Sequence, residues 1–172
     1  MAQTVLDSDL QVKGTVIAQT FRYPAGSIVN ADIGAGAAIA ASKLQRQQAF
    51  SVELCPEGTN ISAIASKLLH IFRAGGTING IEAAITGAAT GDRAATVDLQ
   101  KGNAGGSFAT ILTAPIAINS SLAVRTPLAG AISSGSAADG DLLRLVVGVS
   151  GSTGTQPQGL LVTVTCTEDY SA

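Results

Sequence analysis

The chain has 172 residues, of which 46% are hydrophobic and only 13% are charged, and its formal net charge is −2. This length accommodates one ordinary domain plus an appendage, and the hydrophobic fraction is sufficient to build a core. The ten Lys and Arg residues are scattered along the chain, which argues against a phosphate-binding surface, so we expect no nucleic-acid partner.

Two long uncharged stretches, 102–124 and 145–167, are interrupted every few residues by Gly, Ser, Thr, Asn or Gln. A membrane-spanning helix needs about 20 consecutive apolar residues, so neither stretch predicts a span and we expect no membrane partner. The first residues lack a basic start followed by an apolar run, so we expect no secretory signal and assembly in the cytoplasm of the producing cell. A surface this poor in charge is typical of a protein covered by neighbouring copies or by another protein.

Residues 1–30 are predicted to form an N-terminal arm. Its short apolar pieces include Val16 and Ile17, and two of the few aromatic residues, Phe21 and Tyr23, follow close behind. A segment without a core of its own becomes ordered on another surface, and exposed aromatic side chains are favoured anchors there. We expect these four residues to make an attachment site, and the alternative is a leader packed against its own domain.

Residues 31–48 are predicted to form a short helix of small residues with a polar exit at 45–48. Asp32 is placed to cap the free backbone amides, and apolar residues then recur at spacings of three and four. The resulting stripe consists of Ile33, Ala37, Ala40 and Leu44, with Ile39 beside it. Because Ala and Gly dominate the segment, a lone helix buries little surface, whereas several copies approach closely around a shared axis. The stripe therefore predicts self-association, and spacing alone does not distinguish a dimer from a trimer.

Residues 49–172 are predicted to form a mainly β domain, an antiparallel β-sandwich of jelly-roll type. Short stretches with period-two alternation are separated by Gly-rich turns, and no long helical pattern interleaves them. The expected strands are 50–55, 68–72, 77–85, 94–100, 107–112, 142–149 and 160–167. The nearly continuous apolar run at 142–149 indicates a central strand. In the last strand, alternate residues from Leu160 to Cys166 are expected to face inward and to leave a threonine-rich outer face.

The run Asn-Ala-Asp-Ile-x-x-x-Ala-Ala-Ile-Ala-x-Ser-Lys-Leu at 30–44 resembles a segment of tailed-phage tail fibres and head fibres. The stretches 95–101, 141–147 and 159–164 are similar to the β-sandwich domains of phage head-decoration or head-fibre proteins. The resemblance implies a virion structural protein that decorates the capsid surface as a homotrimer, bound to the major capsid protein through its N-terminal arms. The three-fold symmetry comes from the resemblance. The alternative is a receptor- or glycan-binding tip domain of a tail fibre, although aromatic residues are sparse for that role.

Groups for catalysis or metal binding are few, and we expect no catalytic residue, metal or cofactor. The sole histidine, His70, lies in an expected strand without a nucleophile-elbow sequence nearby, so we expect it on a polar or interfacial face. Asp139-Gly140-Asp141 lacks the later ligands of a calcium loop and is expected to be a polar turn. The glycine runs lack a following Lys-Ser/Thr pair and predict loops, not phosphate sites. Glu168 and Asp169 are expected to form a solvated tail.

The two cysteines, Cys55 and Cys166, lie on the first and last expected strands, which often neighbour each other in a sandwich. A disulfide is therefore geometrically conceivable. Two small buried thiols that stay reduced in the cytoplasm are the favoured interpretation. Neither spacing suits a metal site.

Overall fold

The computed structural model describes residues 45–103 and 105–169, which form two antiparallel β-sheets. The predicted β-sandwich is confirmed, and the described residues contain no helix. The N-terminal arm and the small-residue helix lie outside them, except for residues 45–48. The strands are β1 (Gln45–Asn60), β2 (Ile64–Ile71), β3 (Gly76–Gly87), β4 (Ala94–Gly102), β5 (Ala109–Thr110), β6 (Ile116–Ile118), β7 (Leu128–Gly130), β8 (Ser136–Ala137), β9 (Leu142–Ser150) and β10 (Gln158–Asp169).

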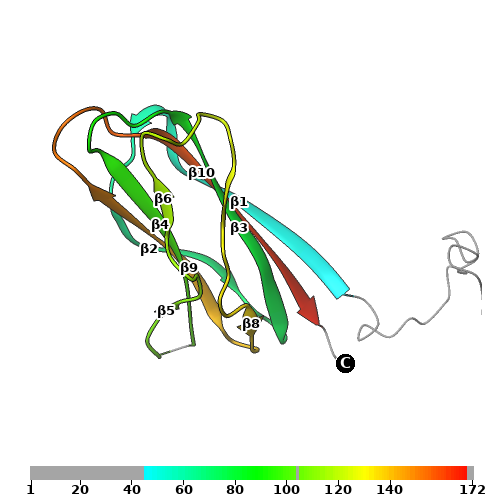
Figure 1. Ribbon diagram of the computed structural model, residues 1–172. Coiled ribbons are helices and arrows are strands. Elements are labelled where there is room, and N and C mark those ends of the chain that lie inside the picture. Colours follow the sequence, from blue (N-terminus) through cyan, green and yellow to red (C-terminus); the bar gives the residue numbers. More distant parts are fainter. Residues whose placement is uncertain (1–44, 104, 170–172) are drawn as a thin grey trace, which may run out of the picture. The chain divides into compact units, whose positions relative to one another are not determined.

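The strands pair like one long antiparallel hairpin that is rolled into two layers. Sheet A has the order β1-β10-β3-β7, and β8 pairs with β3 further along (Figure 1). Sheet B has the order β2-β9-β4-β5, and β6 pairs with β4 further along. The short strands β5 and β6 therefore act as one interrupted strand, as do β7 and β8. Since the first strand pairs with the last, the second with the next to last, and so on inward, the topology is that of a jelly roll.

Alternating side chains of the long strands fill the space between the sheets. β10 buries every second residue from Leu160 onward, and β9 buries Leu143, Leu145 and Val147, as the alternation predicted. β9 lies between β2 and β4, so its predicted central position is also confirmed. The largest fully buried side chains are Phe72, Ile78, Ile81, Ile85, Leu99, Ile118, Leu143, Leu145, Leu160, Glu168, Val97 and Val147.

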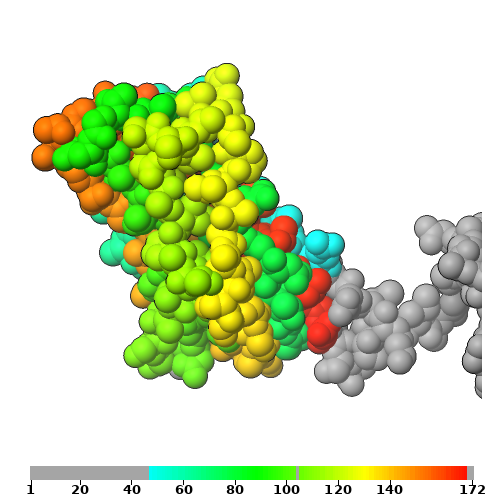
Figure 2. All heavy atoms as spheres, in the orientation of Figure 1, coloured from blue at the N-terminus to red at the C-terminus, as the bar shows by residue number. Residues whose placement is uncertain are grey.

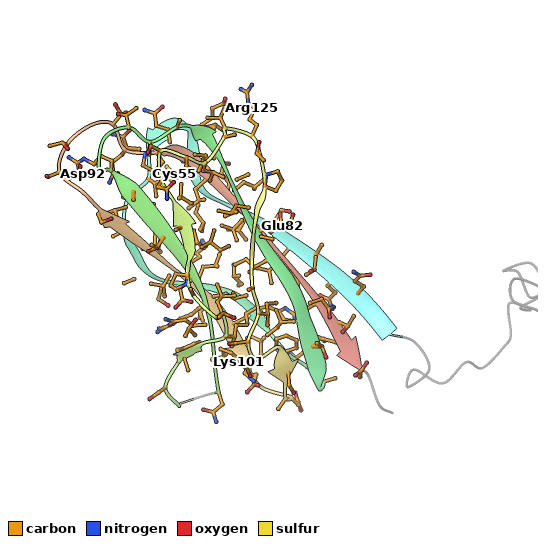
Figure 3. The ribbon with its side chains drawn as sticks, in the orientation of Figure 1. Cys55, Glu82, Asp92, Lys101 and Arg125 are labelled. Atoms are coloured by element: carbon orange, nitrogen blue, oxygen red, sulfur yellow. The ribbon has the colours of Figure 1, made fainter. Side chains whose placement is uncertain are left out.

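The sandwich has two different ends. The chain enters at Gln45, which pairs with Asp169, so the start of β1 and the end of β10 lie together at what we call the entry end. The loops β1–β2, β3–β4, β6–β7 and β9–β10 lie at the opposite, distal end (Figure 1). Figure 3 places Asp92 and Arg125 at the distal end and Lys101 toward the entry end.

The two sides of the sandwich also differ. On one side the segment carrying β5 to β8 covers the gap between the sheets, as the yellow-green and yellow spheres of Figure 2 show, and Leu112 bridges to Ile132 there. On the other side β1 and β2 end their sheets, and each is paired along one edge only. Unpaired strand edges are places where a sheet can meet another chain.

Some element boundaries differ from the prediction. β1 begins at Gln45, so residues 45–48, the predicted polar exit of the helical segment, are extended. β5 covers only Ala109–Thr110 of the strand expected at 107–112. β6, β7 and β8 were not predicted, because strands of two or three residues are too short to show an alternating pattern.

Candidate functional site

The residues predicted from the sequence to form binding surfaces lie outside the described residues. These are the oligomerisation stripe, Ile33, Ala37, Ile39, Ala40 and Leu44, and the capsid-attachment set, Val16, Ile17, Phe21 and Tyr23. Both sets stay predictions. Within the sandwich, the candidate sites are the clusters of ionisable side chains and the outer faces of the two sheets.

His70 points between the sheets, so the expected polar or interfacial position was wrong. A bulge between Leu68 and His70 shifts the register, and His70 lies opposite the buried Leu143 of β9. Its imidazole Nε2 forms a hydrogen bond with Glu168 Oε1, and the His70 side chain is only 15% exposed. The ring packs against Phe50 at a centroid distance of 4.6 Å and edge-on against Phe72 at 4.9 Å.

Glu168 is fully buried, so the expected solvated tail was also wrong at this position. β10 continues its inward alternation past Cys166, which turns Glu168 into the core, whereas Asp169 is exposed. The His70–Glu168 hydrogen bond joins β2 of sheet B to β10 of sheet A near the entry end. Burial, and then the charge of Glu168, raise the pKa of the Cys166 thiol, so this thiol stays protonated at neutral pH.

Asp92 ties two distal loops together. Its carboxylate accepts hydrogen bonds from the backbone N–H groups of Ser152 at 3.0 Å and Thr153 at 2.6 Å, and from Thr153 Oγ1 at 2.9 Å. The hydrogen bonds from Thr153, with a further one from Ser152, hold the pKa of Asp92 below its usual value. Gly91 approaches the same loop with φ +65°, and a Cβ there would lie 2.4 Å from the Thr153 carbonyl oxygen. This glycine run is therefore a loop, as predicted.

Asp139-Gly140-Asp141 forms the polar turn that we expected. The Asp141 carboxylate accepts a hydrogen bond from the Ala138 N–H at 2.9 Å and forms an ion pair with Lys101 Nζ at 3.2 Å. These contacts close the turn that leads into β9. Residues 45–103 and 105–169 contain no group of three His, Cys, Asp or Glu side chains placed to hold a metal ion.

The two cysteines are buried and free. β1 and β10 are neighbours, as predicted, but Cys166 lies opposite Gln48 whereas Cys55 lies opposite Leu160. This register separates the two thiols by about seven strand positions, or ~23 Å, far beyond disulfide distance. The interpretation as two buried free thiols is confirmed.

The outer face of sheet A consists mainly of small side chains. Thr163, Thr165 and Thr167 alternate outward along β10, which confirms the predicted threonine-rich face, and Ser51 Oγ lies 3.0 Å from Thr163 Oγ1. A register shift beside Thr165 leaves a hollow of about 390 Å³ on this face. It is lined by Asn79, Gly80, Ile81, Glu82, Ala129, Gly130, Thr163 and Thr165.

A hydrogen-bonded network crosses the outer face of sheet B. Thr110 Oγ1 and Gln100 Nε2 donate to the Asp98 carboxylate at 2.5 and 2.8 Å. Arg144 Nε and Nη2 both donate to Gln100 Oε1, at 2.9 and 2.7 Å, and the Arg144 guanidinium lies 4.0 Å from the centre of the Phe108 ring. The network fixes β5, β4 and β9 against one another. The only sequence signal for it was the single Arg within the apolar run at 142–149.

Within the described ranges we find no helix with the length and apolar character that crossing a membrane requires.

No protein-family model matches the chain, and no curated protein sequence does. Similar solved structures include that of the infectious bursal disease virus Gt strain, with 17% identity, a TM-score of 0.30 and coverage of 74% of this chain and 36% of that one. A mutant VP2 protein of the same virus in derived T=1 particles has 14% identity, a TM-score of 0.34 and coverage of 73% and 37%. The Gx strain has 12% identity, a TM-score of 0.31 and coverage of 74% and 37%. The chain thus spans little more than a third of the length of these viral chains.

Proposed function

We propose that the protein is a non-enzymatic structural protein of a phage virion. It decorates the capsid surface as a homotrimer, binds the major capsid protein through its N-terminal arms and displays the β-sandwich outward. The resemblance of residues 30–44 to fibre segments supports the phage assignment and the three-fold symmetry. Three arms held together raise the effective concentration for each further contact, so a modest affinity per arm gives firm attachment.

The observation that carries this proposal is that the chain enters the sandwich at one end while the loops gather at the other. The chain enters at Gln45, and the distal loops lie at the opposite end. A domain that is held through its N-terminal side therefore presents the distal end, with Asp92 and Arg125, away from the attachment point (Figure 3).

The ionisable groups of the sandwich support a structural role. His70 holds Glu168 between the sheets, Asp92 holds two distal loops together, and Lys101 and Asp141 close a turn. Each of these groups is engaged in fixing the fold. Proteins that work by display and attachment need such rigidity in the part that they display.

Deleting residues 1–30 tests the proposal. We expect the truncated protein to keep the circular dichroism spectrum and cooperative unfolding of a β-sandwich, and to lose binding to particles that lack the native copy. Binding is measured by co-sedimentation of the purified protein with those particles. If the truncated protein still decorates particles, attachment resides in the sandwich and the proposal is wrong.

Point substitutions in the arm test attachment without deleting the segment. Phe21→Ala together with Tyr23→Ala should weaken co-sedimentation, because aromatic anchors carry much of an interface's binding energy. The matched control is Val124→Ala, which removes an apolar side chain that is 44% exposed, from a distal loop. The control should bind like the wild type, and equal losses for both variants would refute attachment through the arm.

The hollow on the outer face of sheet A favours a second candidate function, a receptor- or glycan-binding tip of a tail fibre. Its volume of about 390 Å³ suits a small ligand, and Asn79, Glu82 and Thr163 offer hydrogen-bonding groups. No aromatic ring is among its lining residues. Calorimetric titration with host-surface polysaccharide distinguishes the two candidates: binding that Glu82→Gln abolishes supports the tip domain, and no heat supports decoration.

A further inference from the structure

Asn79 of β3 is followed by Gly80 and has no ladder partner on either side. Facing β10, the pairing passes from Ile78 to Gly80 and leaves Asn79 as the extra residue of a β-bulge. On the opposite edge of β3, β8 pairs with residues 76–77 and β7 with residues 81–83, so Asn79 lies in the gap between these two short strands. The backbone at Asn79 is therefore less restrained than where both neighbouring strands pair with β3.

The side-chain carboxamide of Asn79 is exposed and unengaged. It lines the hollow of about 390 Å³ on the outer face of sheet A, and no side chain or backbone group in the described part of the chain forms a hydrogen bond with it. By contrast, Asn60 Oδ1 accepts a hydrogen bond from Gln158 Nε2 at 3.1 Å, and Asn119 Oδ1 accepts one from the Ser121 N–H at 3.0 Å. No contact thus fixes the orientation of the Asn79 carboxamide.

Gly80 is not a glycine that the fold requires. Its φ lies outside the left-handed region, and a Cβ built on it would meet Thr165 Oγ1 at 3.0 Å and nothing else within 4 Å. Because the hydroxyl of Thr165 can rotate, a small side chain fits here. The effect of glycine at this position is to leave the backbone nitrogen open to close approach.

We propose that Asn79–Gly80 is a self-modification site, at which Asn79 loses its carboxamide in a reaction that consumes only water. The backbone nitrogen of Gly80 forms a bond to Cγ of Asn79, and the side-chain NH₂ group takes up the Gly80 amide proton and leaves as ammonia. The resulting cyclic imide then takes up a water molecule and opens at either of its carbonyl groups. The products are aspartate and isoaspartate at position 79.

The reaction changes the charge of the hollow. Before it, Glu82 is the only acidic residue among those that line the hollow. A carboxyl group at position 79 is ionised at neutral pH, so the hollow acquires a second negative charge. Isoaspartate also adds a methylene group to the backbone, at a residue that neither neighbouring ladder engages. The inference does not depend on the proposed function, because it concerns how the outer face of sheet A changes as the protein ages.

Peptide mapping by mass spectrometry of the full-length protein tests this inference. During incubation in mildly alkaline buffer, the peptide with Asn79 should gain about 1 Da, the difference between a carboxamide and a carboxyl group. The peptides with Asn60 and Asn119 should gain this mass later. An isoaspartyl methyltransferase should then methylate the peptide that contains position 79. Conversion of Asn79 no faster than that of Asn60 and Asn119 would overturn the inference.

The unfolded chain shows what the fold contributes. Local opening at a residue without ladder partners costs little free energy, so the folded protein should convert Asn79 within about tenfold of the rate measured in guanidinium. A folded rate far below that range would mean that the sandwich protects the site, which overturns the inference.

The matched variant is Gly80→Ala, whose Cβ crowds the attacking nitrogen. It should slow the gain of mass at Asn79, while the circular dichroism spectrum and the unfolding midpoint stay close to those of the wild type. Equally fast conversion in a folded Gly80→Ala protein would show direct hydrolysis by water and overturn the cyclic route.

Discussion

Replacing His70 by leucine removes the imidazole from the buried Glu168 carboxylate. Removing one partner of a buried hydrogen bond costs about 1–3 kcal/mol, and more where the remaining group is charged. Loss of the ring contacts with Phe50 and Phe72 adds about 0.5–1.5 kcal/mol each. A domain of this kind has a free energy of unfolding of about 5–15 kcal/mol, so His70→Leu should remove a large share of it.

The coupling free energy between His70 and Glu168 tests their contact more specifically than either single substitution does. Glu168→Leu should also be costly, whereas the double variant places two apolar side chains together between the sheets. Replacing both partners of a buried hydrogen bond by apolar groups of similar shape can be nearly neutral in stability, so the double variant should lose at least about 1 kcal/mol less than the sum of the single variants. The chain has no Trp, so guanidinium unfolding at pH 7 is followed by circular dichroism.

The control is the surface ion pair Arg125–Glu57, whose side chains are 75% and 69% exposed at a separation of 3.0 Å. Exposed pairs contribute about 0–1 kcal/mol, so Arg125→Leu should change the unfolding midpoint little. If the losses of His70→Leu and Glu168→Leu add to within about 0.5 kcal/mol, the two groups are not coupled and the inter-sheet tie is refuted.

Three further predictions concern a loop, the thiols and the helical stripe. The pKa of Asp92 is lowered in the folded state, so its contribution to stability is present above the unfolded value near 3.8 and is lost as pH falls through the folded value. In Asp92→Asn, the thermal unfolding midpoint should therefore fall less steeply below about pH 4 than it does in the wild type. An equally steep fall in the variant would contradict this. Cys55→Ser with Cys166→Ser should unfold at nearly the wild-type temperature, and reductant should not shift the wild type; a reductant-sensitive midpoint would reveal a disulfide. Ala40→Asp should convert the proposed oligomer to a monomer in light scattering, because a charge would be costly in the predicted close-packed stripe, and an unchanged mass would move the interface to the sandwich.

The long strands could be predicted because their pattern is strong. Residues 142–149 form a nearly continuous apolar run and residues 160–167 alternate strictly, and these stretches become β9 and β10. The first strand was recognised from residue 50, but its beginning at Gln45 was missed because Gln-Arg-Gln-Gln has no apolar alternation. β6 to β8 are held in place by the long β3 and β4, and such tertiary pairing leaves no local signal.

The His70–Glu168 pair was missed although a signal for it existed. Glu168 follows Cys166 by two positions and so has the inward parity of β10, but a carboxylate at a chain end suggests solvent. A carboxylate with inward parity needs a partner, and the sole histidine was the natural candidate. The partnership itself required the sheet order that places β2 across from β10.

The jelly roll alone does not decide the function. Capsid proteins, lectin domains and cupins share this architecture, so function depends on the surfaces that are added to it. The surfaces that we predict for this protein are the N-terminal arm and the helical stripe, and each has its own experiment above.

Electron microscopy of the particles that carry this protein tests the central claim most directly. Val124→Cys places one reactive thiol on a distal loop, and a maleimide gold cluster then marks that end of the sandwich while the buried native thiols stay unlabelled. Decoration of the capsid predicts gold distributed over the head and standing off the shell, with the entry end toward the capsid. Gold confined to the tip of the tail, or lying flush against the shell, would contradict it.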